Sequence, residues 1–159
     1  MKNNKFLLAA GLIAGSVLTC LPVTGFALET LTFSGGICDV ADPAKVAQVF
    51  AHHSGAINTS ATSSVVVTCS LTRDFTSDTN GANIVVKAFR DATATVPLSC
   101  TMVSRDFNGN TLASNTNQTN GVGVVALSLN VATSGINGFY TVACTLPQKS
   151  VLRGITLNE

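Results

Sequence analysis

Hydrophobic and polar residues alternate along most of the chain after residue 60, in short runs separated by polar turns. The clearest runs are Ser64–Leu71, Ile84–Arg90, Leu98–Ser104, Gly121–Val131, Phe139–Leu146 and Val151–Leu157. Alternation with a period of two is typical of a β-strand that buries one face. Thr111–Ser114 gives a weaker signal of the same kind. The pattern predicts an all-β fold.

A single antiparallel β-sandwich of about eight strands fits these runs, because turn signals separate them at short intervals. A β-barrel is the main alternative, and the order of the strands does not follow from the pattern. Before the first clear run, Asp42-Pro43 has the residue types of a helix start. We expect a turn there, followed by a strand that includes Phe50.

The first 27 residues have the three-part order of a secretory signal peptide. Met1–Lys5 is basic, Phe6–Leu21 is almost entirely apolar, and Gly25-Phe26-Ala27 places small residues at a cleavage point. Cleavage there leaves one secreted or periplasmic domain at residues 28–159, with no remaining membrane span. An uncleaved anchor and a lipid attached at Cys20 are the alternatives.

Four cysteines remain after residue 27, namely Cys38, Cys69, Cys100 and Cys144. An even number in an exported chain predicts two disulfides, and the spacing does not match a metal site. Three pairings are possible. We favour Cys38–Cys69 and Cys100–Cys144, because sequential pairing suits neighbouring strands. Three of the four sulfurs fall in the apolar phase of their strands and should point inward.

Charge and composition limit the classes of partner that the chain is expected to bind. Residues 28–159 carry seven Lys or Arg and eight Asp or Glu, a formal net charge of −1. Without a basic stripe, nucleic acid is not an expected partner. Ser, Thr and Asn dominate the strand faces expected to be exposed, which suits hydrogen bonding to polyols. The absence of Trp and the single Tyr argue against an aromatic sugar platform.

One short pattern occurs twice. Cys69 is followed by Arg73-Asp74-Phe75, and Cys100 is followed by Arg105-Asp106-Phe107. Each copy predicts a strand that passes through a buried cysteine and leaves the sheet at an Arg-Asp turn. The simpler interpretation is paired charges at strand ends with the Phe tucked under the loop. The alternative is a binding surface made by Arg73, Asp74, Arg105 and Asp106 in two surface loops.

Metal and cofactor sites are not predicted. Asp106–Asn110 resembles the start of a calcium loop, but the later positions that such a loop needs hold Thr111 and Asn117. Asp74, Asp78 and Asn80 form a second oxygen-rich stretch, and turn chemistry explains both. His52 and His53 are adjacent, so on a strand they should face opposite ways and not share a metal.

Catalytic patterns are also missing from the sequence. No Gly-x-Ser-x-Gly elbow occurs, and Glu29 and Glu159 are the two glutamates of residues 28–159. A third hypothesis, an enzyme of unrecognised type, would need a pocket that holds at least two of Asp74, Asp78, Asp91 and Asp106. Two glycosylation sequons, at Asn58 and Asn117, lie in turn-like stretches and should be exposed. We therefore expect no enzyme.

The chain from Cys38 to Glu159 resembles a group of small exported bacterial proteins of unknown function. The shared features are Cys38, Ile57–Ser60, Val67–Cys69, Arg73-Asp74, Ser99–Thr101, Phe139–Pro147 and the final Glu159. The resemblance implies one secreted β domain and brings no activity with it.

Leu31–Val40 is similar to the first strand of chaperone–usher pilus subunits, which are incomplete sandwiches that receive a strand from the next subunit. That resemblance implies a missing strand and a free arm at Leu28–Ser34. Our first hypothesis is instead a secreted non-enzymatic sandwich that binds a ligand or surface outside the cell, with a glycan as one option. The pilus subunit is the alternative.

Overall fold

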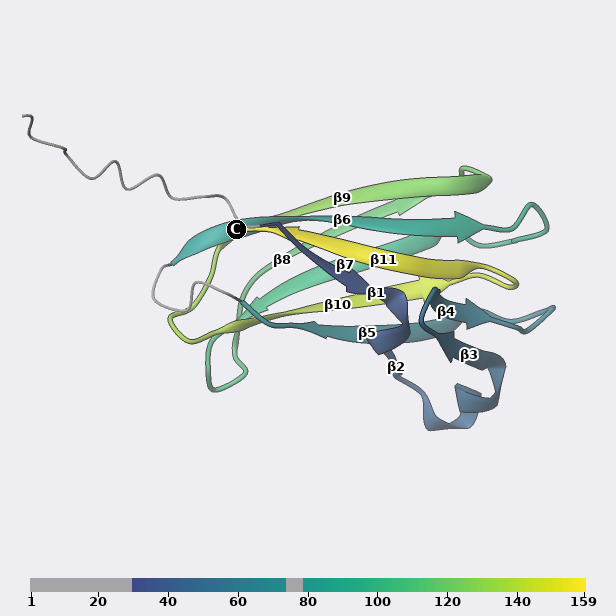
Figure 1. Ribbon diagram of the computed structural model, residues 1–159, viewed down its shortest axis with the longest axis horizontal. Coiled ribbons are helices and arrows are strands. Elements are labelled where there is room, and N and C mark those ends of the chain that lie inside the picture. Colours follow the sequence, from purple (N-terminus) through teal and green to yellow (C-terminus); the bar gives the residue numbers. More distant parts are fainter. Residues whose placement is uncertain (1–29, 74–78) are drawn as a thin grey trace, which may run out of the picture.

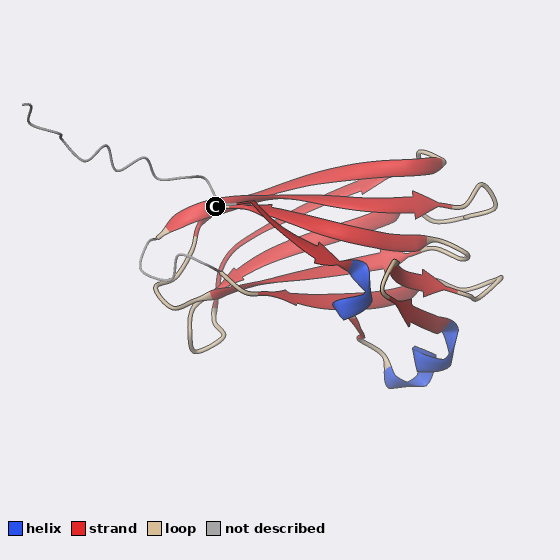
Figure 2. Cartoon of the chain, in the orientation of Figure 1, coloured by secondary structure: helices blue, strands red, loops and turns tan. Residues whose placement is uncertain are grey.

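The computed structural model describes residues 30–73 and 79–159. The predicted signal peptide and Cys20 lie outside the described residues. Within them the chain forms eleven strands and two short 3-10 helices. The strands make two antiparallel sheets packed face to face (Figures 1 and 2). The predicted all-β antiparallel sandwich with two disulfides is confirmed.

The first sheet has the strand order β3-β4-β11-β6-β9, and β1 pairs with the edge of β11 that β4 leaves open. Its strands are β1 (Thr30–Ser34), β3 (Val49–His52), β4 (Gly55–Asn58), β6 (Asn80–Arg90), β9 (Gly123–Thr133) and β11 (Val151–Asn158). β9 is therefore one free edge of this sheet.

The second sheet has the order β2-β5-β10-β7-β8. Its strands are β2 (Asp39–Val40), β5 (Val65–Leu71), β7 (Leu98–Arg105), β8 (Thr111–Thr119) and β10 (Phe139–Leu146). β8 is a free edge here, and it lies against β9 of the first sheet. The two edge strands meet along one side of the sandwich.

Alternating burial explains why these segments are strands. Along β7 and β10 every second residue is buried, including Met102 and Tyr140 with no exposed surface. The inward residues of both sheets form one apolar core of Val, Leu, Ile and Cys side chains. Removing this apolar surface from water is the main stabilising contribution to the fold.

The structure departs from the predicted elements where the alternation fails. β8 extends to Thr119, well beyond the weak signal at Thr111–Ser114. Its residues are polar on both faces because an edge strand of this length overhangs the core. Near the N-terminus, Asp42 caps a 3-10 helix (η2, Pro43–Gln48) that leads into β3, as the helix-start signal indicated. A shorter 3-10 helix (η1, Gly35–Ile37) follows β1.

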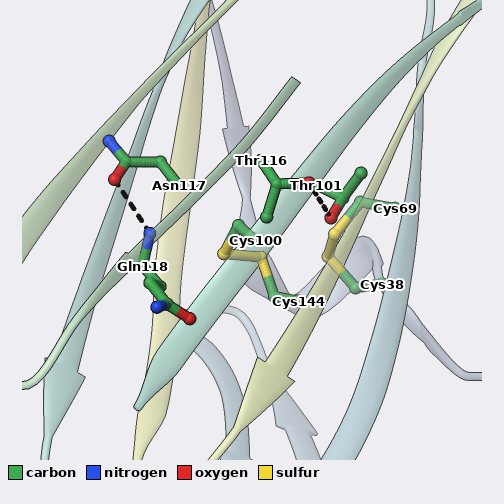
Figure 3. Close-up of a disulfide and its surroundings, with 8 residues drawn as sticks. All are labelled: Cys38, Cys69, Cys100, Thr101, Thr116, Asn117, Gln118 and Cys144. Atoms are coloured by element: carbon green, nitrogen blue, oxygen red, sulfur yellow. Dashed lines mark hydrogen bonds between the residues drawn. A yellow bond between two sulfur atoms is a disulfide. The ribbon is translucent and has the colours of Figure 1, made fainter. Parts of the chain in front are cut away.

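Both disulfides lie within the second sheet and join neighbouring strands, as the favoured pairing predicted. Cys38 precedes β2 and bonds Cys69 of β5, with a Cα–Cα distance of 4.2 Å. Cys100 of β7 stands opposite Cys144 of β10, at 4.1 Å. All four side chains are buried (Figure 3). The bonds therefore join strands of one sheet and leave the two sheets to be held together by the core.

Candidate functional site

A groove of about 550 Å³ lies where the two edge strands meet beside β6. Volumes of this size are typical of small-ligand sites. Nine residues line it: Asn83, Ile84 and Val85 of β6, Asn115, Thr116 and Asn117 of β8, and Ser128, Leu129 and Asn130 of β9. We call it the amide groove, because four of these residues are asparagines.

Two β8 asparagines explain how the groove is held open between the sheets. The Asn117 Nδ2 group donates to the backbone carbonyl of Ser128 at 2.9 Å, and Asn115 Oδ1 accepts from the backbone N–H of Asn130 at 3.4 Å. These amides satisfy part of the open edge of β9, where another strand would otherwise pair. Amide side chains therefore bridge the two sheets without closing the space between them.

Asn83 and Asn130 form a second fixed unit on the outer face of the first sheet. They stand opposite each other in the β6–β9 register, and Asn130 Nδ2 donates to Asn83 Oδ1. The remaining amide atoms, Asn83 Nδ2 and Asn130 Oδ1, have no partner among the described residues. The Asn83 amino group and the Asn130 amide oxygen therefore remain available to a ligand as donor and acceptor.

The groove is chemically neutral. None of its nine lining residues carries an acid, a base or a histidine. Its donors and acceptors are amides, hydroxyls and backbone groups, and Val85 adds a half-buried apolar side chain. This arrangement can bind an uncharged, hydrogen-bonding molecule, and its lining residues supply no group for proton transfer.

The Cys100–Cys144 disulfide supports the β8 side of the groove. Asn117 stands opposite Cys100 in the β7–β8 register, and Cys100 is bonded to the next strand, β10. On the other face of the sheet, Thr101 and Thr116 share a hydrogen bond of 2.8 Å (Figure 3). Side-chain and covalent links thus fix the strand that presents Asn115 and Asn117.

Arg73 is buried, and its prediction as a surface-loop residue is wrong. Its side chain is 1% exposed and forms an ion pair with Glu159 at 2.7 Å. It also donates to the carbonyl of Gly135 at 2.7 Å and lies over the ring of Tyr140 at 5.4 Å. Arg73 follows β5 and Glu159 follows β11, so this contact joins the two sheets. Asp74 and Phe75 lie outside the described residues.

Arg105 and Asp106 serve their own turn. Arg105 donates to the carbonyl of Gly109 at 2.8 Å, and Asp106 accepts from the backbone and side-chain nitrogens of Asn110. The hydrogen bond from the Asn110 side chain holds the pKa of the Asp106 carboxyl below its usual range. Phe107 is 70% exposed, so the prediction that it is tucked under the loop is wrong.

Arg73 and the Arg105-Asp106 turn lie at the same end of the sandwich. The loop between β9 and β10 separates them: its Gly135 accepts from Arg73 and lies against the backbone of Asp106. They do not form a shared open surface, because Arg73 points into the protein. Within the described part of the chain, no group of three or more His, Cys, Asp or Glu side chains could hold a metal ion.

The predicted orientation of His52 and His53, on opposite faces of a strand, is wrong. The rings of His52 and His53 are 3.6 Å apart between centroids and do not face opposite ways. The reason is that β3 ends at His52, so His53 belongs to the turn that follows. Phe50 stacks on His52 at 6.0 Å. Ser54 hydrogen-bonds the His52 ring.

The pocket that the enzyme hypothesis requires does not form from Asp91 and Asp106, the two of its aspartates that the structure describes. Asp91 follows β6 beside the β10–β11 loop, where its backbone N–H donates to Ser150. Asp106 follows β7, at the opposite end of the sandwich. Hydrogen bonds from Thr93 hold the pKa of the Asp91 carboxyl below its ordinary value. Asp74 and Asp78 lie outside the described residues.

The two sequons differ. Asn58 is fully buried, so the expectation that it is exposed is wrong. Its Nδ2 donates to the carbonyls of Ser63, Leu146 and Pro147 at 2.9–3.0 Å, which ties β4 to the β10–β11 loop. Asn117 is exposed, but it lies within a strand of the groove and not in a turn.

The expected free N-terminal arm is also corrected. Thr30–Ser34 pairs along its whole length with β11, and Leu31 and Phe33 pack against the core. Leu28 and Glu29 lie outside the described residues. Across residues 30–73 and 79–159, no helix is long and apolar enough to cross a membrane.

Sequence reasoning missed the amide groove. Its asparagines come from three strands up to 47 residues apart, so no local motif connects them. The available signal was modest: Asn115 and Asn117 alternate within a polar run, and Asn83 and Asn130 occupy outward positions of two apolar strands. The four asparagines come together only through the pairing of β6 with β9 and the contact of β8 with β9.

Comparison with known proteins informs the fold. No protein-family model and no curated protein sequence matches this chain. An isomalto-dextranase of Arthrobacter globiformis T6, solved with panose, is similar in structure at a TM-score of 0.50 and 10% identity, over 80% of this chain and 23% of that one. A GH26-CBM35 β-(1,4)-mannanase of Podospora anserina has a TM-score of 0.47 at 10% identity, over 82% and 28%. This chain spans about a quarter of the length of those proteins. At 10% identity, the likeness to the isomalto-dextranase shows the fold alone.

Proposed function

We propose that this chain is an exported, non-enzymatic binding protein that recognises an uncharged ligand outside the cytoplasm through the amide groove. The observation that carries the proposal is the groove itself: an open space of about 550 Å³ between two sheet edges, lined by four asparagines and no charged residue. The amides of Asn115 and Asn117 cover part of the β9 edge. Edge protection does not account for the Asn83–Asn130 pair, which lies on the outer face of β6 and β9 and lines the same groove.

Export is supported by the cysteine chemistry. Two buried disulfides form and persist in an oxidising compartment, and they are rare in the cytosol. The signal-peptide pattern of residues 1–27 agrees with this assignment. A binding role is supported over catalysis because the groove offers hydrogen bonds without a titratable group, which general acid–base chemistry requires.

The test is groove-dependent retention on extracellular material. Purified protein of residues 28–159 is mixed with cell-envelope and extracellular matrix fractions of the organism that makes it, and sedimented protein is quantified. We expect retention that drops several-fold in the variant Asn83→Ala/Asn115→Ala/Asn130→Ala. The control Asn108→Ala changes an exposed asparagine outside the groove and should behave as the parent chain. Equal retention of all three proteins, or none, contradicts the proposed function.

A further inference from the structure

The free hydrogen-bonding atoms of the amide groove have a specific arrangement. Asn83 Nδ2 and Asn130 Oδ1 belong to one hydrogen-bonded pair held in register by β6 and β9. On the β8 side, Asn115 Nδ2 is a further donor without a partner among the described residues. The groove therefore offers a donor and an acceptor from one bonded pair on β6 and β9, and a further donor on the adjacent strand β8.

A carboxamide pair of this kind complements two neighbouring hydroxyl groups. Each hydroxyl both donates and accepts, so one can accept from an amide nitrogen while the next donates to an amide oxygen. Because the two asparagines already bond each other, little side-chain freedom is lost when a ligand arrives. Pre-organised amides thus favour a rigid vicinal diol over a flexible chain.

The lack of charged lining residues selects against anionic ligands. Phosphate, sulfate and carboxylate ligands are usually recognised by Arg, Lys or helix N-termini, and none of these lines the groove. Lys87 lies on the same outer face of β6, two residues beyond Val85 and outside the lining set. Desolvating an anion in the groove would go uncompensated.

The apolar contacts complete the match. Val85 is half-buried on the same outer face of β6 as Asn83, opposite Ser128, and presents a small aliphatic surface. A sugar ring has a C–H face beside its hydroxyls, so it can contact Val85 while the hydroxyls reach the amides. No aromatic ring lines the groove, so a single site binds weakly and retention on a polymer depends on many contacts.

From these observations we infer that the groove binds neutral saccharides and reads a pair of vicinal hydroxyl groups through Asn83 and Asn130, with Asn115 contacting the sugar from β8. The inference rests on the proposed function and names the ligand class of the same site. The same amide chemistry is also compatible with a peptide backbone, which serves as the competing outcome of the test.

The experiment has two arms. In affinity electrophoresis, protein of residues 28–159 migrates through gels that contain dextran, mannan or soluble starch as neutral probes, or alginate or hyaluronan as anionic probes. We expect retardation by at least one neutral polymer and none by the anionic ones. Asn83→Ala and Asn130→Ala should each weaken binding by about 3- to 10-fold. Asn108→Ala should have no effect.

In the second arm, the neutral polymer and the envelope material of the retention assay are treated with periodate, which cleaves vicinal diols. The inference expects that both lose binding after treatment. If retention on envelope material depends on the groove but survives periodate, and no neutral polymer retards the protein, the saccharide assignment is overturned while the proposed function stands. If groove variants bind like the parent chain, both fall.

Discussion

Arg73 contacts three parts of the protein at one end of the sandwich. Its guanidinium is paired with Glu159, bonded to Gly135 and placed over Tyr140, while its side chain is almost fully buried. Removing one member of a buried ion pair leaves an uncompensated charge and costs far more than the pair itself contributes. The contact therefore controls how the end of β11 is held.

We predict that Arg73→Ala lowers the free energy of unfolding by about 3–5 kcal/mol in urea denaturation, because Glu159 would stay buried without its cation. Arg153→Ala is the matched control. That arginine is exposed on β11, so its loss should change stability by less than about 0.5 kcal/mol. Similar losses in the two variants would show that the pair has no special role.

Tyr140 is a built-in probe of the same region, because it is the only tyrosine in a chain without tryptophan. Burial raises the pKa of its hydroxyl above the ordinary value of about 10. A near-ultraviolet absorbance titration should therefore show a native midpoint above 10 that returns to about 10 in denaturant. A native midpoint at or below the denatured one would place the ring in solvent.

The sign of the linked stability change follows from that shift. The folded protein holds the Tyr140 proton more tightly than the unfolded chain, so this group favours folding below pH 10 and loses its contribution as pH rises through the folded pKa. The free energy of unfolding should therefore fall above about pH 10. Tyr140→Phe should reduce the tyrosine-linked part of that fall.

At the scale of elements, the second sheet is reinforced along its inner face by two disulfides that close 31- and 44-residue separations. In the chain-entropy model each contributes about 4 kcal/mol, mainly by restricting the unfolded chain. We predict losses of this size for Cys38→Ala/Cys69→Ala and for Cys100→Ala/Cys144→Ala, measured by urea denaturation. A loss under about 1 kcal/mol for either pair would contradict this role.

The two disulfides should differ in their effect on the groove. Cys100 stands opposite Asn117, so loss of Cys100–Cys144 loosens the strand that carries two groove asparagines. Cys38–Cys69 lies on the far side of the sheet, beyond β10. In the retention assay, Cys100→Ala/Cys144→Ala should bind more weakly, and Cys38→Ala/Cys69→Ala should bind like the parent chain.

The bounds of a strand follow from the sequence to a degree that depends on its place in the sheet. β5, β7 and β10 were predicted nearly to the residue because their inward positions are uniformly apolar. The pattern predicts too short a β8, because an edge strand can be polar on both faces without losing its pairing. The short strands β1 to β4 carry too few residues for a period to show.

The candidate site was less predictable for the same reason. The alternating pattern of a strand predicts that a cysteine at an apolar position is buried. An exposed asparagine has no such signal, because asparagine is common in turns and on surfaces. Asn58 illustrates the difference: its sequon suggested exposure, while three backbone carbonyls hold it in the interior. Long-range strand order, which decides such contacts, is absent from local patterns.

At the scale of the whole molecule, the first sheet provides its own N-terminal strand. β1 occupies the β11 edge beside β4, and its apolar side chains reach the core. A subunit that polymerises by strand donation offers a free arm to the next subunit, whereas Thr30–Ser34 is paired within its own sheet. We therefore predict a single compact band for protein of residues 28–159 on a non-reducing gel without boiling. A ladder of detergent-resistant multimers would support the pilus hypothesis instead.

The central claim is that the amide groove is the binding surface, and mapping the ligand by NMR tests it most directly. Labelled protein of residues 28–159 is titrated with oligosaccharides of whichever neutral polymer retards it, or with soluble fragments of the envelope material that retains it if no polymer does. The account predicts shift changes confined to the side-chain and backbone amides of Asn83, Asn115, Asn117 and Asn130 and their neighbours. Unchanged spectra, or changes centred on Phe107 and Ile136 at the end of the sandwich, would contradict it.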